Sequence, residues 1–114
     1  MNTSAAMCES ISDTNFEEKV LQNGNRPIFI IFGAEWSGTY QMLQSVVGGV
    51  ASDFSDKVDF YQIDIEESPI YANMMNIREV PSVFIFYNGD VVDHFTGLHS
   101  RRKVRARLEQ IINA

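Results

Sequence analysis

The sequence predicts a single α/β domain in which a central mixed β-sheet carries helices on both faces, and three observations support this. A continuous apolar run at 28–32, a helical pattern and a second strand-like run at 58–65 indicate a β-α-β unit with parallel strands. Asn88-Gly89 separates two further apolar runs, which is the strongest short-range signal for an antiparallel hairpin. An amphipathic helix is then expected after Ser100.

At the N-terminus we expect residues 1–10 to be a flexible segment and residues 11–114 to form the domain. Thr14 and Glu17 have the spacing of a capping box, in which each side chain satisfies a free backbone N–H of a starting helix. This helix should run to about Gln22. Gly24 stands where a left-handed residue would end it.

The run at 28–32 should be a central strand, because it is apolar at every position. A long helix should begin near Ser37, although Gly48 and Gly49 weaken it by on the order of 1 kcal/mol each. Apolar residues recur along it at helical spacing: Met42, Leu43, Val46, Val47, Val50 and Phe54.

In the second half, Ser68 and Pro69 have the residue types of an N-cap and a first helical position, so a short helix is expected over 70–76. Strands are expected at 82–87 and 91–95, on either side of the Asn88-Gly89 turn. The last helix should bury one apolar stripe: Val104, Leu108, Ile111 and Ile112.

Composition narrows the function classes. The net charge of -6 argues against general nucleic-acid binding, which depends on Lys and Arg to neutralise phosphates. No apolar run approaches the roughly 18 to 20 residues of a membrane span, and residues 1–10 lack the features of a signal peptide, so we expect a cytoplasmic protein without membrane contact. His94 and His99 lack the cysteine or carboxylate spacing of a metal site, and no metal or other cofactor is expected.

The residues at the landmarks of this fold resemble the thioredoxin family over roughly Phe16 to Ile112. The motif 34–40 reads Ala-Glu-Trp-Ser-Gly-Thr-Tyr and follows the first core strand. Val-Pro-Ser at 80–82 precedes the next strand, Phe-Tyr-Asn-Gly-Asp at 86–90 covers the hairpin, and Gly97 lies beyond it. The resemblance implies the thioredoxin fold.

Members of that family carry Trp-Cys-Gly-Pro-Cys, and the resemblance places Ser37 and Tyr40 at the two cysteine positions. A serine hydroxyl is not appreciably ionised near neutral pH, and a tyrosine cannot share an S–S bond. The chain contains one cysteine, Cys8, so it cannot perform intramolecular dithiol–disulfide chemistry. The family's buried acid and neighbouring lysine correspond to Ile31 and Gln62. Its motif proline and helix-kinking proline correspond to Thr39 and Ser45.

The family's peptide-binding groove is the feature that the sequence keeps. The resemblance implies a bond of cis geometry before Pro81, and a backbone at Val80 that can pair with an extended peptide without any cysteine. We therefore expect a redox-inactive protein-binding or adaptor module, not an enzyme, whose partner is a protein or peptide. The expected groove residues are Trp36, Ser37, Gly38, Thr39, Tyr40, Val80, Pro81 and Gly97.

Alternatives stay open beside this one. The chain could serve a thiol redox pathway through Cys8 or a partner's thiols, or it could be a structural subunit whose oligomeric state the sequence does not give. Hydrolysis by Ser37 is disfavoured, because there is no Gly-x-Ser-x-Gly elbow and no third member of a triad. Tyr40 could either pack at the groove mouth or present its hydroxyl to a peptide.

A basic cluster near the C-terminus stands out in an otherwise acidic chain. Positive charge in the first turn of a helix opposes the helix dipole. We expect a solvated helix face that the acidic remainder neutralises, and a docking patch is the alternative. The cluster consists of Arg101, Arg102, Lys103, Arg105 and Arg107.

Overall fold

A computed structural model describes residues 8–113. The elements follow one another as β1 (Glu9–Ile11), η2 (Glu17–Leu21), β2 (Ile28–Gly33), α1 (Gly38–Phe54), β3 (Asp59–Asp64), α2 (Pro69–Met74), β4 (Ser82–Tyr87), β5 (Asp90–Thr96) and α3 (Arg101–Ile112). None of the helices within this described range is long and apolar enough to cross a membrane.

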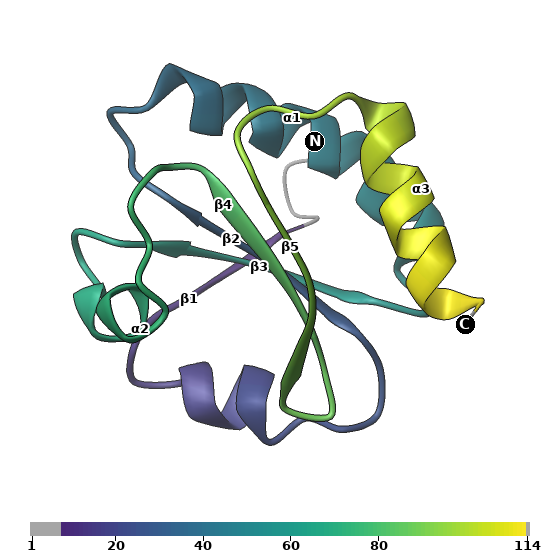
Figure 1. The fold of residues 1–114 in the computed structure, drawn as a ribbon, viewed down its shortest axis with the longest axis horizontal. Coiled ribbons are helices and arrows are strands. Elements are labelled where there is room, and N and C mark those ends of the chain that lie inside the picture. The colour runs from purple at the N-terminus through teal and green to yellow at the C-terminus, as the bar shows by residue number, and fades with distance from the viewer. Residues whose placement is uncertain (1–7, 114) are drawn as a thin grey trace.

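The strands form one five-stranded mixed sheet in the order β1-β3-β2-β4-β5. β3 pairs in parallel with both β1 and β2, whereas β4 pairs antiparallel with β2 and β5. In Figure 1, α1 and α3 lie on one side of the sheet, and α2 and the short helix after β1 lie on the other. This confirms the predicted fold class.

Alternation along the central strands creates two cores. Phe29 and Ile31 of β2 face the cluster formed with α1 and α3, and Ile28, Ile30 and Phe32 face the cluster formed with η2 and α2. Every residue of β2 is buried, which explains why the run is apolar at every position and not only at alternate positions. The sheet is thus covered on both faces, and the loops at its ends remain available for a site.

The N-terminal expectations need correction. Glu9 and Ser10 lie in β1, where they pair with Tyr61 and Gln62 of β3, so these two residues are not part of a flexible segment. The rest of that expectation falls mainly on residues 1–7, which lie outside the described residues. A strand of three residues has no periodicity of its own to detect, and the pairing with β3 defines it.

The first helix also differs from its prediction. Thr14 and Glu17 form no capping box, because the Thr14 hydroxyl is 2.7 Å from Ser12 Oγ and the side chain of Asn15 instead accepts the Ser12 N–H at 2.8 Å. The helix is a short π-helical turn over η2 that ends at Leu21. Gly24 is not left-handed: among the described glycines, positive φ occurs at Gly89 and Gly97.

Three other helix starts have defined caps. Ser37 accepts the N–H of Tyr40, and Ser100 accepts the N–H of Lys103, so α1 and α3 begin where the sequence predicts, each with a serine as its N-cap. Ser68 has the predicted position at α2 but makes no side-chain cap bond. Instead, the carboxylate of Asp13 accepts the N–H of Ile70 at 3.0 Å and of Tyr71 at 3.2 Å.

The Asn88-Gly89 turn is confirmed. Both residues have positive φ, 58° and 84°, which is the backbone a two-residue type I′ hairpin loop requires. β4 and β5 extend from it over 82–87 and 90–96, and a register shift between Ile85 and Phe86 marks an irregularity in the pairing.

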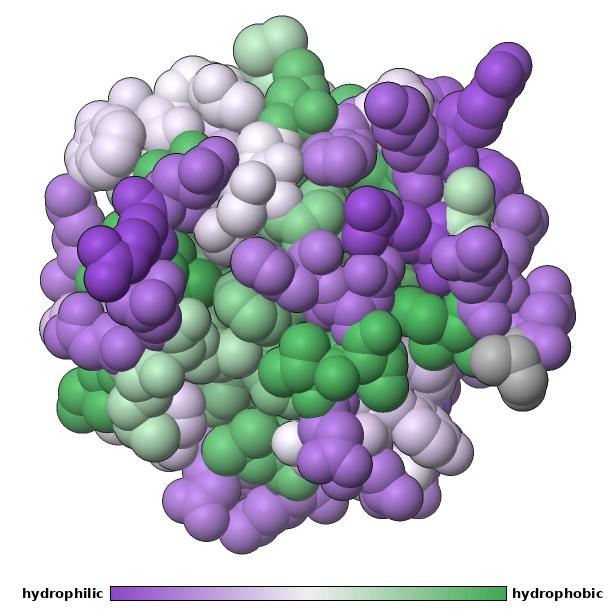
Figure 2. All heavy atoms as spheres, in the orientation of Figure 1, coloured by the Kyte–Doolittle hydropathy of each residue, from purple (hydrophilic) through white to green (hydrophobic). Residues whose placement is uncertain are grey.

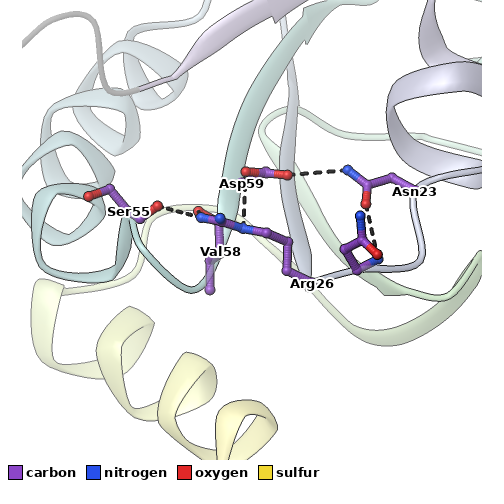
Figure 3. A network of polar contacts seen from close by, with 6 residues as sticks. Asn23, Arg26, Ser55, Val58 and Asp59 are labelled. Carbon is purple, nitrogen blue, oxygen red and sulfur yellow. Dashed lines mark hydrogen bonds and ion pairs between the residues drawn. The ribbon is translucent and has the colours of Figure 1, made fainter.

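At the end of the sheet where β2 begins, Arg26 ties three segments together (Figure 3). Its guanidinium donates to the carbonyl oxygens of Ser55 and Val58, and its Nε lies 3.3 Å from Asp59 Oδ1. Asn23 also donates to Asp59, at 3.2 Å. These contacts fix the loop before β2 against the connection between α1 and β3.

Candidate functional site

The motif loop and the Val80-Pro81 segment lie at the same end of the sheet. Phe32, near the end of β2, pairs with Ser82 at the start of β4, so residues 34–37 and 80–81 extend from neighbouring strand ends. The Val80–Pro81 bond is cis, and the carbonyl oxygen of Pro81 accepts the N–H of Gly97 at 2.9 Å. The fold therefore brings together three segments that are far apart in the chain.

Ser37 is a helix cap in this structure. Its side-chain oxygen accepts the backbone N–H of Tyr40 at 3.1 Å, and the residue is 7% exposed. Among the hydrogen bonds of the described chain, none joins Ser37 to a histidine. The hydroxyl consequently has no general base to activate it as a nucleophile.

Tyr40 is a core residue, 4% exposed, in the cluster between the sheet and α1 and α3. Its ring lies on Gly33: a Cβ at position 33 would be 2.2 Å from two ring carbons. Burial, and then the charges of Cys8, Glu35 and Asp64, raise the pKa of Tyr40 to about 12. The tyrosine thus packs as a neutral aromatic group in the core.

The other expected groove residues are more open. Trp36 is 67% exposed, and its indole N–H donates to Glu66 Oε2 at 2.7 Å. Gly38 and Thr39 are exposed, Val80 and Gly97 are half-buried, and Pro81 is buried. Three of the expected groove residues, Ser37, Tyr40 and Pro81, are therefore buried, and the exposed surface among the set belongs to Trp36, Gly38 and Thr39.

Ile31 and Gln62 lie side by side on β2 and β3. Ile31 is fully buried, so the position contributes packing where an acid would need a partner. Gln62 accepts from Gln44 Nε2 at 2.9 Å and donates to Ser10 Oγ at 3.0 Å. This neutral chain of amide and hydroxyl groups links α1, β3 and β1, and it carries no titratable group.

Cys8 precedes β1 and packs against the core cluster that contains Tyr40. Within the described residues this cysteine is free and forms no disulfide. Burial raises the pKa of this thiol from 9.0 to about 12. At neutral pH the nucleophilic thiolate form is therefore scarce.

The two histidines make local contacts. His94 is exposed and stacks on Phe84, with ring centroids 4.2 Å apart. His99 packs against Phe95 and has its Nε2 3.1 Å from the carbonyl oxygen of Thr96. Across residues 8–113, no group of three His, Cys, Asp or Glu side chains is arranged to hold a metal ion.

The basic cluster divides into two parts on α3. Arg105 pairs with Asp53 at 2.6 Å and lies over the ring of Phe54. Arg107 pairs with Asp93 at 2.8 Å, and lies over another aromatic ring. These two arginines are neutralised by the domain itself, as expected for the whole cluster. The exposed residues Arg101, Arg102 and Lys103 are in no ion pair of the described chain.

Two hollows bear on binding. The larger, about 1130 Å³, lies away from the motif, where Arg26 and Asp93 meet the end of α3. Figure 2 shows hydrophobic surface alongside β5 and the end of α3 in this region.

The smaller hollow, about 400 Å³, is a shallow groove that starts at the motif's Gly38 and continues along α1 to Leu98. Sequence reasoning missed Leu98 and Met42 of this groove; their exposure, 44% and 58%, is what reveals them.

Comparison with known families identifies this arrangement. The family model for thioredoxin matches residues 7–110. The chain belongs to the thioredoxin family. Among curated thioredoxin relatives, Thioredoxin M4 of Arabidopsis thaliana, a chloroplastic protein, is 35% identical over a match of 113 residues that covers 97% of this chain and 58% of that relative. The thioredoxin of Rickettsia bellii is 32% identical over 86% of this chain and 92% of its own length.

A third thioredoxin, from Griffithsia pacifica, is 34% identical over 76% of this chain and 79% of that protein. The chain thus spans a little over half of its Arabidopsis relative and most of the other two. Family membership and the mixed α/β sheet agree with the thioredoxin fold that the sequence indicates. This thioredoxin-family chain nevertheless has a single cysteine, outside its motif.

Proposed function

We propose that this chain is a redox-inactive, thioredoxin-like binding module that recognises an extended segment of a partner protein. The observation that carries the proposal is the use of the two motif positions: Ser37 caps α1, and Tyr40 fills the core against Gly33. Each of these two side chains has a structural role that is unrelated to sulfur chemistry. The module would then act by binding alone, without catalysis.

The neighbouring surface supports binding. Trp36 is largely exposed although tryptophan is usually buried, and exposed aromatic side chains are frequent anchors of protein interfaces. The backbone at Val80, beside the cis bond, is at the same end of the sheet. An extended peptide could pair with this backbone and contact the indole. A cytoplasmic location and the absence of nucleic-acid and membrane partners belong to the same proposal.

The alternative, a thiol pathway that uses Cys8, has less support. A thiol with a pKa of about 12 is a poor nucleophile near pH 7, because few molecules carry the thiolate. The thiol is also packed against the core cluster, which limits the approach of a partner's disulfide. No structural observation favours this alternative over the binding module.

Reduction of insulin disulfides by dithiothreitol tests the redox half of the proposal. The wild-type chain should give a rate no higher than that of a blank without protein, because neither motif position holds a thiol. The variant Ser37→Cys/Tyr40→Cys restores two thiols at the start of α1 and provides the comparison. A wild-type rate above the blank would overturn the proposal that the chain is redox-inactive.

Selection of peptides from a random library displayed on phage tests the binding half. Peptides enriched on the wild-type chain should lose at least about fivefold in affinity for Trp36→Ala, the typical effect of truncating an aromatic anchor. Val91→Ala is a matched control, because Val91 is 48% exposed but lies at the hairpin end of β5. Equal affinity for wild type and Trp36→Ala would contradict the assigned groove.

A further inference from the structure

The shallow groove beside the motif is lined by apolar and polar residues of α1 on one side and by Leu98 on the other. It lies between α1 and the segment before α3, and its lining is Gly38, Gln41, Met42, Ser45, Val46 and Leu98. Met42 and Leu98 contribute the large exposed apolar side chains. Because Gly38 is the first residue of α1, the groove is continuous with the motif loop.

The α1 side of this groove carries no charge. Residues 36–52 contain no Asp, Glu, Lys or Arg, although 21% of the whole chain is charged. In Figure 2 the surface over α1 is pale, whereas the surface over α3 is strongly hydrophilic. A segment lying along residues 36–52 would therefore meet no charged side chain of that stretch before it reaches the cations of α3.

Arg101 marks the far end of this α1 face. Its guanidinium lies over Gly49, where an added Cβ would be 3.0 Å from the Arg101 Cζ atom. Gly49 is two helical turns after Met42, on the same side of α1. Arg102 and Lys103 follow in the first turn of α3, exposed and without an ion pair in the described part of the chain.

The positive charges of these three residues are electrostatically unfavourable at their position in α3. They stand at the N-terminal end of a 12-residue helix, where the helix dipole favours negative charge. They also belong to a chain of net charge -6, and the acidic remainder of this chain would repel an acidic ligand. An acidic group that docks at this point would interact favourably with both the cations and the end of the helix.

We propose that the groove holds an extended partner segment in which apolar side chains pack against Met42 and Leu98 and acidic side chains reach Arg101 and Arg102. This inference rests on the proposed binding function and adds the chemistry of the ligand. The charge complementarity selects the partner: an acidic and apolar peptide.

The same phage selection tests this preference. Enriched peptides should combine apolar residues with Asp or Glu at one end. Replacing these acids by Asn or Gln in a synthetic peptide should weaken binding by about fivefold to tenfold in low salt, and less in high salt. Enrichment of peptides without acidic residues would overturn the inference while leaving the binding function intact. Enrichment no greater than on an unrelated protein would overturn both.

Matched variants locate the effect on α3. Arg101→Gln/Arg102→Gln should abolish the preference for the acidic peptide over its amide version. Arg105→Gln/Arg107→Gln removes the same charge from residues that Asp53 and Asp93 already neutralise, so it should keep the preference. Equal losses in both variants, measured on folded protein, would refute the assigned position. So would a dimer in sedimentation that only Arg101→Gln/Arg102→Gln dissociates, because a second copy would then be the occupant.

Discussion

The ring of Tyr40 occupies the space directly above the backbone of Gly33. A Cβ at position 33 would lie 2.2 Å from two ring carbons and 2.5 Å from a third, and all of these distances are far below van der Waals contact. The glycine at the end of β2 and the tyrosine in the first turn of α1 therefore depend on each other. This pairing turns the second motif position into part of the core.

The first prediction concerns that pair. Gly33→Ala should lower the free energy of unfolding by about 1 to 3 kcal/mol, because the added methyl group forces the buried ring to move. In a Tyr40→Ala background the same substitution should cost much less, since the ring is absent. Urea denaturation of the four proteins in the cycle measures the coupling. Additive effects would show that the two residues are independent.

A matched glycine gives the control for this cycle. Gly48 lies inside α1, and a Cβ there would meet nothing within 4 Å. Gly48→Ala should therefore stabilise the protein by up to about 1 kcal/mol through helix propensity. If Gly48→Ala destabilised the protein, helix propensity would not determine the effect of alanine in α1. Gly48→Ala could then not serve as the control for Gly33→Ala.

A second prediction concerns high pH. The pKa of Tyr40 is about 12 in the folded chain and about 10 in an unfolded one, so the fold prefers the neutral phenol. Its contribution is fully present below pH 10 and is lost as the pH rises toward 12. In a Cys8→Ser background, which removes another buried group that titrates there, Tyr40→Phe should reduce the fall in stability over this range, and the raised pKa of Tyr61 contributes equally to both curves. Parallel curves would rule out Tyr40 as the cause.

The third prediction concerns Cys8. Because burial raises the pKa of its thiol to about 12, alkylation by iodoacetamide at pH 8 should be on the order of a hundredfold slower in the folded chain than in urea. Mass spectrometry at timed intervals follows the reaction. A folded chain that reacts as fast as the unfolded one would revive the thiol-pathway alternative.

The fourth prediction concerns the cap of α2. Asp13→Ala removes the carboxylate that accepts the N–H groups of Ile70 and Tyr71 and should cost about 1 to 2 kcal/mol of stability. Ser68→Ala should cost less, because Ser68 makes no side-chain cap bond. Hydrogen exchange of the α2 amides compares the two variants. Faster exchange in Ser68→Ala than in Asp13→Ala would reverse the assignment of the cap.

The sequence alone determined the order of the long elements, the Asn88-Gly89 turn, the helix starts near Ser37 and Ser100, and the lack of a cysteine pair. Periodicity and capping involve residues within about four positions of one another, so a linear pattern contains them. Recognition of the family then located the motif, the Val80-Pro81 segment and Gly97.

Only the tertiary structure decided where distant residues meet. Asp13 caps a helix that begins 56 residues later, β1 exists because β3 pairs with it, and Tyr40 turns inward because Gly33 leaves room for its ring. It also separated Arg105 and Arg107, which form ion pairs with Asp53 and Asp93, from Arg101 and Arg102, which are exposed and in no ion pair of the described residues. Such contacts depend on how the chain folds back on itself, and no local pattern of residues contains that information.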